Sequence, residues 1–146
     1  MKRPSWEATW LEVARVVAKR STCRRRNVGA VIVDDLNRVV AVGYNGAPRG
    51  MAHCIDVGCL LDQNGSCIRT VHAEVNAIAQ AGTQARGTTL YTTTAPCLHC
   101  MYLIIQSGIK RVVYSDIGPH SCELDYLKDA GVEVVQYKEE VTDEEA

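Results

Sequence analysis

Two cysteines behind a proline form the stretch of this sequence in which residue types and spacing most directly suggest chemistry. Cys97 follows Pro96, and Cys100 lies three residues further on. Because proline suits the first position of a helix, we expect both thiols in the first turns of a helix, on one face. Unpaired N–H groups and the helix dipole favour thiolates there, the form that binds metal. The spacing alone fits a redox dithiol equally well.

His72 and Glu74 favour a metal site over a redox dithiol. Both stand at the start of a predicted helix, and a predicted strand joins that helix to the cysteines. One His and two Cys leave the fourth position of a tetrahedral zinc open for water, which is the pattern of a catalytic site. Glu74 is then placed to move protons and not to bind metal. A redox dithiol needs neither residue.

The combination His-x-Glu followed by Pro-Cys-x-x-Cys is the signature of zinc-dependent nucleobase deaminases. The sequence has HAE at residues 72–74 and PCLHC at residues 96–100. We therefore predict His72, Cys97 and Cys100 as zinc ligands and Glu74 as the catalytic proton shuttle. His99, about 100° around the helix from each cysteine, is expected to face away from the metal. The competing interpretation is a buried, helix-capping histidine with a coincidental cysteine pair.

The elements that must position these residues alternate between helix and strand. Ser5 can cap a first helix, and two apolar runs on either side of residues 34–37 predict a hairpin. Residues 46–70 have the composition of one long loop. The later elements are a helix at 71–82, a strand at 88–94, a helix at 96–108, a strand at 110–115, a helix at 122–131 and a strand at 132–137. This alternation predicts an α/β fold, a three-layer α/β/α sandwich around a five-stranded mixed sheet with helices on both faces.

Composition excludes several classes of protein. A length of 146 residues fits one domain, and 47% hydrophobic with 23% charged residues disfavours disorder. The N-terminal segment interrupts its apolar positions with charged side chains, so we expect neither a signal peptide nor a membrane span and predict a cytoplasmic protein. A net charge of −1 offers no basic surface to duplex nucleic acid.

Several further stretches extend the similarity to nearly the whole chain. They are STC before VGAVIV, GYNGAPRG, CIRTVHAEVNAI, APCLHC and IIQSGIKRVVY. Together they make the sequence similar to the deoxycytidylate (dCMP) deaminases, including their bacterial competence-operon relatives, over about residues 5–137. The resemblance implies a CMP/dCMP-type deaminase domain at 1–137, followed by an acidic tail at 138–146. It also implies that the enzyme hydrolyses dCMP to dUMP and releases ammonia. The resemblance further implies a homo-oligomer, with a hexamer favoured. In this family dCTP, bound together with Mg²⁺, would activate the enzyme, and dTTP would inhibit it.

The resemblance also assigns residues around the substrate. Asn45 lies where related deaminases touch the nucleoside, and Asn76 lies on the helix of the site. The GYNGAPRG segment would belong to the regulatory region, through Gly43, Tyr44, Asn45, Gly46, Pro48 and Gly50, although a Gly- and Pro-rich turn explains the same composition. The family usually has a Tyr before a Pro where this sequence has Gly118. Tyr114, His120 or Tyr126 would then supply the aromatic contact to the base, or the pocket is wider.

The remaining cysteines and a basic cluster complete the set of candidates. Four cysteines satisfy a closed tetrahedral zinc site that would tie down the long loop, and the candidates are Cys23, at the end of the first helix, and Cys54, Cys59 and Cys67. His53 is the rival ligand, and small packed thiols are the alternative. Arg24 and Arg26 are candidates to hold a 5′-phosphate, unless they form a solvated turn.

Other functions stay open at this point. Within the same class of enzyme the rivals are a cytidine deaminase, a tRNA adenosine deaminase and a guanine deaminase. The near-neutral charge weakens the tRNA alternative. From a different class, the chain could be a catalytically idle zinc- and nucleotide-binding accessory protein, for which the carboxylate of Glu74 would have no use.

Overall fold

One mixed sheet forms the centre of the molecule. A computed structural model describes residues 2–23, 25–65, 67–118 and 123–139, and within these residues five strands pair in the order β2-β1-β3-β4-β5. The strands are β1 (Gly29–Val33), β2 (Val39–Tyr44), β3 (Thr89–Thr94), β4 (Arg111–Asp116) and β5 (Glu133–Gln136). β1 is antiparallel to both β2 and β3, whereas β3, β4 and β5 are parallel. The predicted five-stranded mixed sheet is therefore confirmed.

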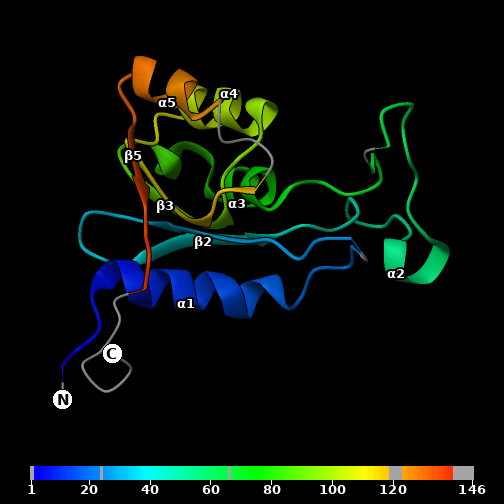
Figure 1. Ribbon diagram of the computed structural model, residues 1–146, viewed down its shortest axis with the longest axis horizontal. Coiled ribbons are helices and arrows are strands. Elements are labelled where there is room, and N and C mark those ends of the chain that lie inside the picture. Colours follow the sequence, from blue (N-terminus) through cyan, green and yellow to red (C-terminus); the bar gives the residue numbers. More distant parts are fainter. Residues whose placement is uncertain (1, 24, 66, 119–122, 140–146) are drawn as a thin grey trace.

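Helices cover both faces of this sheet (Figure 1). α1 (Trp6–Ala18) lies on one face, where Leu11 and Ala14 pack against Val31, Val33 and Tyr91. α3 (Ala73–Ala81), α4 (Leu98–Gln106) and α5 (Asp125–Asp129) lie on the other face, over a larger apolar core. β1 is buried along its whole length because it runs between these layers. The predicted three-layer α/β/α arrangement is confirmed.

Two glycines bring helices close to the sheet. A Cβ on Gly43 of β2 would lie 2.3 Å from the carbonyl oxygen of Ala73, at the start of α3. A Cβ on Gly29 of β1 would lie 1.9 Å from the carbonyl oxygen of Ala14 in α1. Only glycine permits such an approach. The close contact at Gly43 sets the depth at which the first turn of α3, with Glu74, sits above the sheet.

The structure corrects several predicted boundaries. α4 begins at Leu98 with Cys97 as its N-cap, so Pro96 precedes the helix and does not begin it. α1 ends at Ala18, so Cys23 lies beyond the helix. The segment from 46 to 70, predicted as one long loop, projects from the sandwich and contains a short helix, α2 (Cys54–Val57) (Figure 1). This helix was not predicted because four residues are too few to show a helical pattern of apolar positions.

Among the described residues, none of the helices combines the length and the apolar character that crossing a bilayer requires. Of the predicted acidic tail, residues 140–146 lie outside the described part of the chain.

Candidate active site

Three potential metal ligands meet where two helices begin. His72 is the N-cap residue of α3, Cys97 is the N-cap residue of α4, and Cys100 lies in the first turn of α4. Neither N-cap residue uses its side chain to cap its helix, so both side chains are free to turn toward each other.

The distances within this trio fit zinc. His72 Nδ1 lies 3.3 Å from Cys97 Sγ and 3.3 Å from Cys100 Sγ, and the three donor atoms all lie within 4.8 Å of one another. Ordinary Zn–N and Zn–S bonds at tetrahedral angles separate such atoms by about 3.5 Å. The donor set, one imidazole and two thiols, is also the one that zinc prefers.

Electrostatics within the trio favour a bound cation. Hydrogen bonding from Cys100, and then from His72, lowers the pKa of Cys97 to about 3. The same contact with Cys97, together with burial, raises the pKa of Cys100. Hydrogen bonding to Cys97 also raises the pKa of His72. Without a metal the three groups therefore share protons, and a divalent cation would replace those protons.

Glu74 stands beside the trio in the first turn of α3, and its residue is only 4% exposed. Burial raises the pKa of its carboxyl group, while contacts with Cys100, His72 and Thr92 act in the opposite direction. Thr92 Oγ1 donates a hydrogen bond to Glu74 Oε1 over 3.0 Å. A buried carboxyl group with a raised pKa, close to a metal site, can accept and return a proton.

A cavity of about 890 Å³ opens beside the trio. Its wall includes Arg26, Asn45, His72, Glu74, Thr94, Ala95, Cys97 and His99. Asn45 holds part of this wall in place, since its Oδ1 accepts from the backbone N–H of Val28 at 2.8 Å and its Nδ2 donates to the carbonyl of Arg26 at 2.6 Å. The predicted substrate residues Asn45 and Arg26 therefore do reach the cavity.

Other predicted substrate residues lie elsewhere. Asn76 donates to the carbonyl of Tyr44 at 2.8 Å, which joins α3 to the end of β2, and Asn76 is not part of the cavity wall. Tyr114 is 5% exposed and packs in the core on the α3 side of the sheet, because its inward position on β4 faces the helices and not the cavity. Tyr126 is exposed on α5. Arg24 and His120 lie outside the described residues.

Gly118, at the position where the resemblance implies a Tyr, lies close to Thr94 and Arg26. Its φ is +60°, and a Cβ there would lie 2.8 Å from Cγ2 of Thr94 and 3.2 Å from Nη2 of Arg26. The Arg26 guanidinium therefore lies against the position at which the family usually carries a side chain.

A second cluster of thiols lies in the long loop. The Sγ atoms of Cys54, Cys59 and Cys67 lie within 4.8 Å of one another, and Cys54 and Cys67 are 3.6 Å apart. Two sulfurs on a tetrahedral zinc are separated by about 3.8 Å. Burial raises the pKa of Cys54 to about 12. Burial acts in the same direction on Cys67, but backbone N–H groups, first that of Arg69, outweigh it and lower the pKa of Cys67 to about 6.

The predicted fourth ligand is corrected. Cys23 does not belong to the cluster, because its sulfur instead accepts from the backbone N–H of Arg25 at 3.4 Å. The rival ligand His53 directs Nδ1 to the hydroxyl of Thr22 at 3.0 Å. The cluster among the described residues therefore has three donors and not four.

The predicted regulatory segment has structural roles in this fold. Gly43 permits the approach of α3, and Gly46 pairs with Val71 through two backbone hydrogen bonds. Pro48 begins a turn that contains Gly50 at φ +82°, which matches the alternative reading of this composition as a turn. The carbonyl oxygen of Tyr44 accepts a hydrogen bond from Nδ2 of Asn76. Of the predicted regulatory residues, Asn45 alone lines the cavity.

Two further residues lie near the trio, His99 and Thr92. His99 does not belong to the trio, as expected, yet it lines the cavity. Thr92 lies outside the zinc motif, but period-two alternation along β3 puts it on the same face of the sheet as Leu90, below α3. That alternation could have identified Thr92 as a buried hydroxyl close to the helix that carries Glu74.

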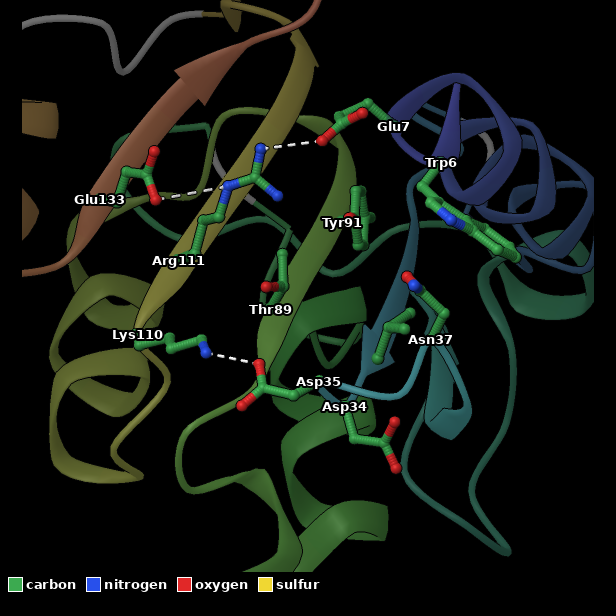
Figure 2. Close-up of a pocket in the computed structure, with 11 residues that line it drawn as sticks. Trp6, Glu7, Asp34, Asp35, Asn37, Thr89, Tyr91, Lys110, Arg111 and Glu133 are labelled. Carbon is green, nitrogen blue, oxygen red and sulfur yellow. Dashed lines mark hydrogen bonds and ion pairs between the residues drawn. The ribbon is translucent and has the colours of Figure 1, made fainter. Parts of the chain in front are cut away.

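A smaller cavity of about 400 Å³ lies at the other end of the parallel strands, beside the first residues of β3, β4 and β5. Figure 2 shows Arg111 paired with Glu7 and Glu133, and Lys110 paired with Asp35. Arg111 bonds to Glu7 at 3.0 Å and approaches Glu133 at 3.5 Å, and Lys110 pairs with Asp35. Because both cations are already matched, this cavity offers no free positive charge to a nucleotide, and its network joins α1 to the sheet.

Comparison with known proteins agrees with the geometry. Residues 4–116 match the family model described as the cytidine and deoxycytidylate deaminase zinc-binding region. ComE operon protein 2 of Bacillus subtilis is 44% identical over 140 residues, which are 93% of this chain and 73% of that protein. Deoxycytidylate deaminase of Schizosaccharomyces pombe is 43% identical over 147 residues, or 92% of this chain, but the chain spans only 45% of that protein.

A solved structure extends this likeness to three dimensions. It is the dCMP deaminase of cyanophage S-TIM5 in complex with dCMP and dUMP, which is 30% identical, with a TM-score of 0.80, over 94% of this chain and 100% of that chain.

Proposed function

The chain belongs to the cytidine and deoxycytidylate deaminase family, and we propose that it hydrolyses dCMP to dUMP and ammonia with the help of zinc. The observation that carries this proposal is the His72, Cys97 and Cys100 trio with the buried carboxyl of Glu74 at its side, on the wall of a cavity of about 890 Å³. The names of the yeast relative and of the phage structure support the choice of dCMP.

We assign His72, Cys97 and Cys100 as the ligands of the zinc. Bound there, zinc would supply a Lewis acid that brings the pKa of a coordinated water to about 7. The three residues leave one tetrahedral position for that water. Contacts with Cys100 and His72 lower the pKa of Cys97, which favours the thiolate form that binds metal.

We assign Glu74 to all the proton transfers of the reaction. It accepts one proton from the attacking water and gives it to N3 of the cytosine ring. It then takes the second proton of that water from the hydroxyl group now on C4 and gives it to the amine, which leaves as ammonia when the C4–N bond breaks. The balance is one dCMP and one water consumed, and one dUMP and one ammonia formed. Its burial suits the role, because a desolvated carboxyl holds a proton more readily than an exposed one.

We assign Arg26 to the 5′-phosphate. Among the described residues, no acidic side chain lies within ion-pair distance of its guanidinium. Arg26 is in the cavity wall, and its positive charge is close enough to His72 to lower the pKa of that histidine. This effect opposes the hydrogen bond with Cys97, which raises the same pKa. Arg25 also lines the cavity, but its guanidinium donates a hydrogen bond to the carbonyl oxygen of Gly65 and is therefore already engaged with the long loop. A free guanidinium in a cavity wall is suited to bidentate phosphate contacts.

Ammonia release with dCMP, deoxycytidine, dCTP and guanine tests the proposed function. We expect turnover of dCMP and little turnover of deoxycytidine. Turnover of deoxycytidine but not of dCMP would remove the assigned role of Arg26, and turnover of guanine alone would replace the proposed reaction.

We also propose a second, structural zinc on Cys54, Cys59 and Cys67. It would tie down a loop whose residues Cys67, Ile68 and Thr70 line the same cavity. Metal analysis of carefully prepared protein should give two zinc ions per chain, and one would contradict this assignment.

The resemblance extends the proposal to regulation and assembly. We infer a cytoplasmic homo-oligomer, favoured as a hexamer, that dCTP with Mg²⁺ activates and dTTP inhibits. Light scattering would measure the size of the assembly. Turnover at subsaturating dCMP, with and without each effector, would test the regulation, and identical rates would contradict it.

A further inference from the structure

A hydroxyl group with no contact to solvent lies beneath the carboxyl group of Glu74. Thr92, in the middle of β3, is 0% exposed, and its neighbours on the adjacent strands are Ala30 and Tyr114. A hydroxyl buried among such residues destabilises a fold unless it is hydrogen-bonded. Leu90, two residues earlier on the same face, belongs to the apolar core. The polar residue at position 92 therefore needs an explanation.

The hydrogen bonds of Thr92 supply that explanation. Its Oγ1 lies 3.0 Å from Glu74 Oε1 and 2.9 Å from the carbonyl oxygen of Thr94. The other polar neighbours of Glu74 are Cys100 and His72. The carboxyl group is thus held between a strand on one side and the predicted zinc ligands on the other.

We propose that Thr92 is the residue that positions Glu74 for proton transfer, an inference that rests on the proposed function. A glutamate side chain has three rotatable bonds, and burial alone does not fix the last of them. A hydrogen bond to one carboxyl oxygen fixes that rotation, and the other oxygen stays available for the reacting atoms. Thr92 is a positioning residue, because it is not part of the cavity wall and acts through Glu74.

The hydrogen bond leaves the second carboxyl oxygen of Glu74 free to react. The single proton of the Thr92 hydroxyl can point to Glu74 Oε1 or to the carbonyl oxygen of Thr94. When Glu74 takes up a proton on its other oxygen, Oε1 remains an acceptor, so the contact between Thr92 and Glu74 persists.

The test replaces Thr92 with Val in the full-length protein, which removes the hydroxyl and keeps the branched shape. We expect kcat for dCMP to fall about 10- to 100-fold, as for other groups that orient a reacting side chain, with KM within about twofold and zinc content unchanged. Thr92→Ser, which restores the hydroxyl, should recover most of kcat.

Thr93→Val is the matched control. Thr93 is the next residue of β3 on the opposite face, and its hydroxyl accepts from the backbone N–H of Gly29 at 3.2 Å. Removing this hydroxyl also breaks a buried hydrogen bond, so stability should fall while kcat stays near that of the unmodified protein. A Thr92→Val protein with kcat within about twofold of the unmodified enzyme, or with a loss no larger than that of Thr93→Val, would overturn the proposal.

Crystal structures of the zinc-loaded unmodified and Thr92→Val proteins separate this inference from the proposed function. We expect the Glu74 carboxyl group to rotate or to adopt two orientations in the variant. An unchanged carboxyl group would overturn the positioning role, whatever the substrate. Failure of the unmodified enzyme to release ammonia from dCMP would instead overturn the proposed function.

Discussion

Replacing Arg26 with Ala should weaken the use of dCMP and leave the use of deoxycytidine unchanged. Arg26 is exposed, lines the cavity and has no acidic partner among the described residues, so its guanidinium can turn to a phosphate without breaking an ion pair. A hydrogen bond to a charged group contributes about 1.5–3 kcal/mol. Solvent screens an exposed group, so we expect the lower end of that range.

An energy of about 1.4 kcal/mol corresponds to a tenfold change in an equilibrium constant. We therefore expect KM for dCMP to rise about tenfold in Arg26→Ala, with kcat nearly constant, since the phosphate takes no part in the bond-breaking step. The effect should also shrink at about 1 M salt, where charges are screened within about 3 Å.

The assay is steady-state ammonia release with dCMP and with deoxycytidine, at low and high salt. Arg69→Ala is the control, because Arg69 donates to a backbone carbonyl of the long loop, that of Gly58 at 3.1 Å, and is not among the residues that line the cavity; its loss should disturb the loop without separating the two substrates. Equal losses with both substrates in Arg26→Ala, or an unchanged KM for dCMP, would refute the assignment of Arg26 to the phosphate.

Three further outcomes follow from the structure. Gly118→Ala should raise KM for dCMP a few-fold, because its Cβ would clash with Cγ2 of Thr94 and press on the Arg26 guanidinium, both in the cavity wall, whereas Gly131→Ala, also at positive φ but facing open space, should leave KM unchanged. Removing zinc with a chelator should abolish turnover and re-adding zinc should restore it; full turnover in protein proven free of metal would contradict the metal assignment. A backbone hydrogen bond and Arg111 lower the pKa of Glu7, so the stability that Glu7 contributes is present above about pH 4.5 and is lost as pH falls through its folded pKa. In urea titrations, Arg111→Met should therefore lose up to about 1 kcal/mol at neutral pH and little at low pH, and an equal loss at both would contradict this.

Much of the fold was predictable because local patterns determine it. The helical spacing of apolar residues after Ser5 predicted α1, and Ser5 does cap it, with Oγ accepting from the N–H of Ala8 at 3.1 Å. Glycine after a periodic segment predicted the end of α3, which is followed by Gly82. Such signals act over a few residues and need no knowledge of the tertiary structure.

The parts that failed depend on how elements rotate and dock. A one-residue shift in the start of α4 makes Cys97 an N-cap residue, which pattern alone does not distinguish from the first helical residue. Tyr114 faces the core because β4 presents that side to the helices, and Cys23 turns toward Arg25 and away from the loop cysteines. The contact of Thr92 with Glu74 likewise requires α3 to sit at one depth and one rotation over β3, which no local pattern fixes.

The most direct test of the account is a comparison of Glu74→Gln with the unmodified protein, measuring zinc content, dCMP binding and ammonia release together. Glutamine keeps the size of the side chain and cannot act as a proton shuttle. We predict zinc at the unmodified level, dCMP bound with similar affinity, and turnover reduced by a factor of about 100 to 10,000. Turnover within about tenfold of the unmodified enzyme, with zinc and dCMP still bound, would contradict the assigned role of Glu74.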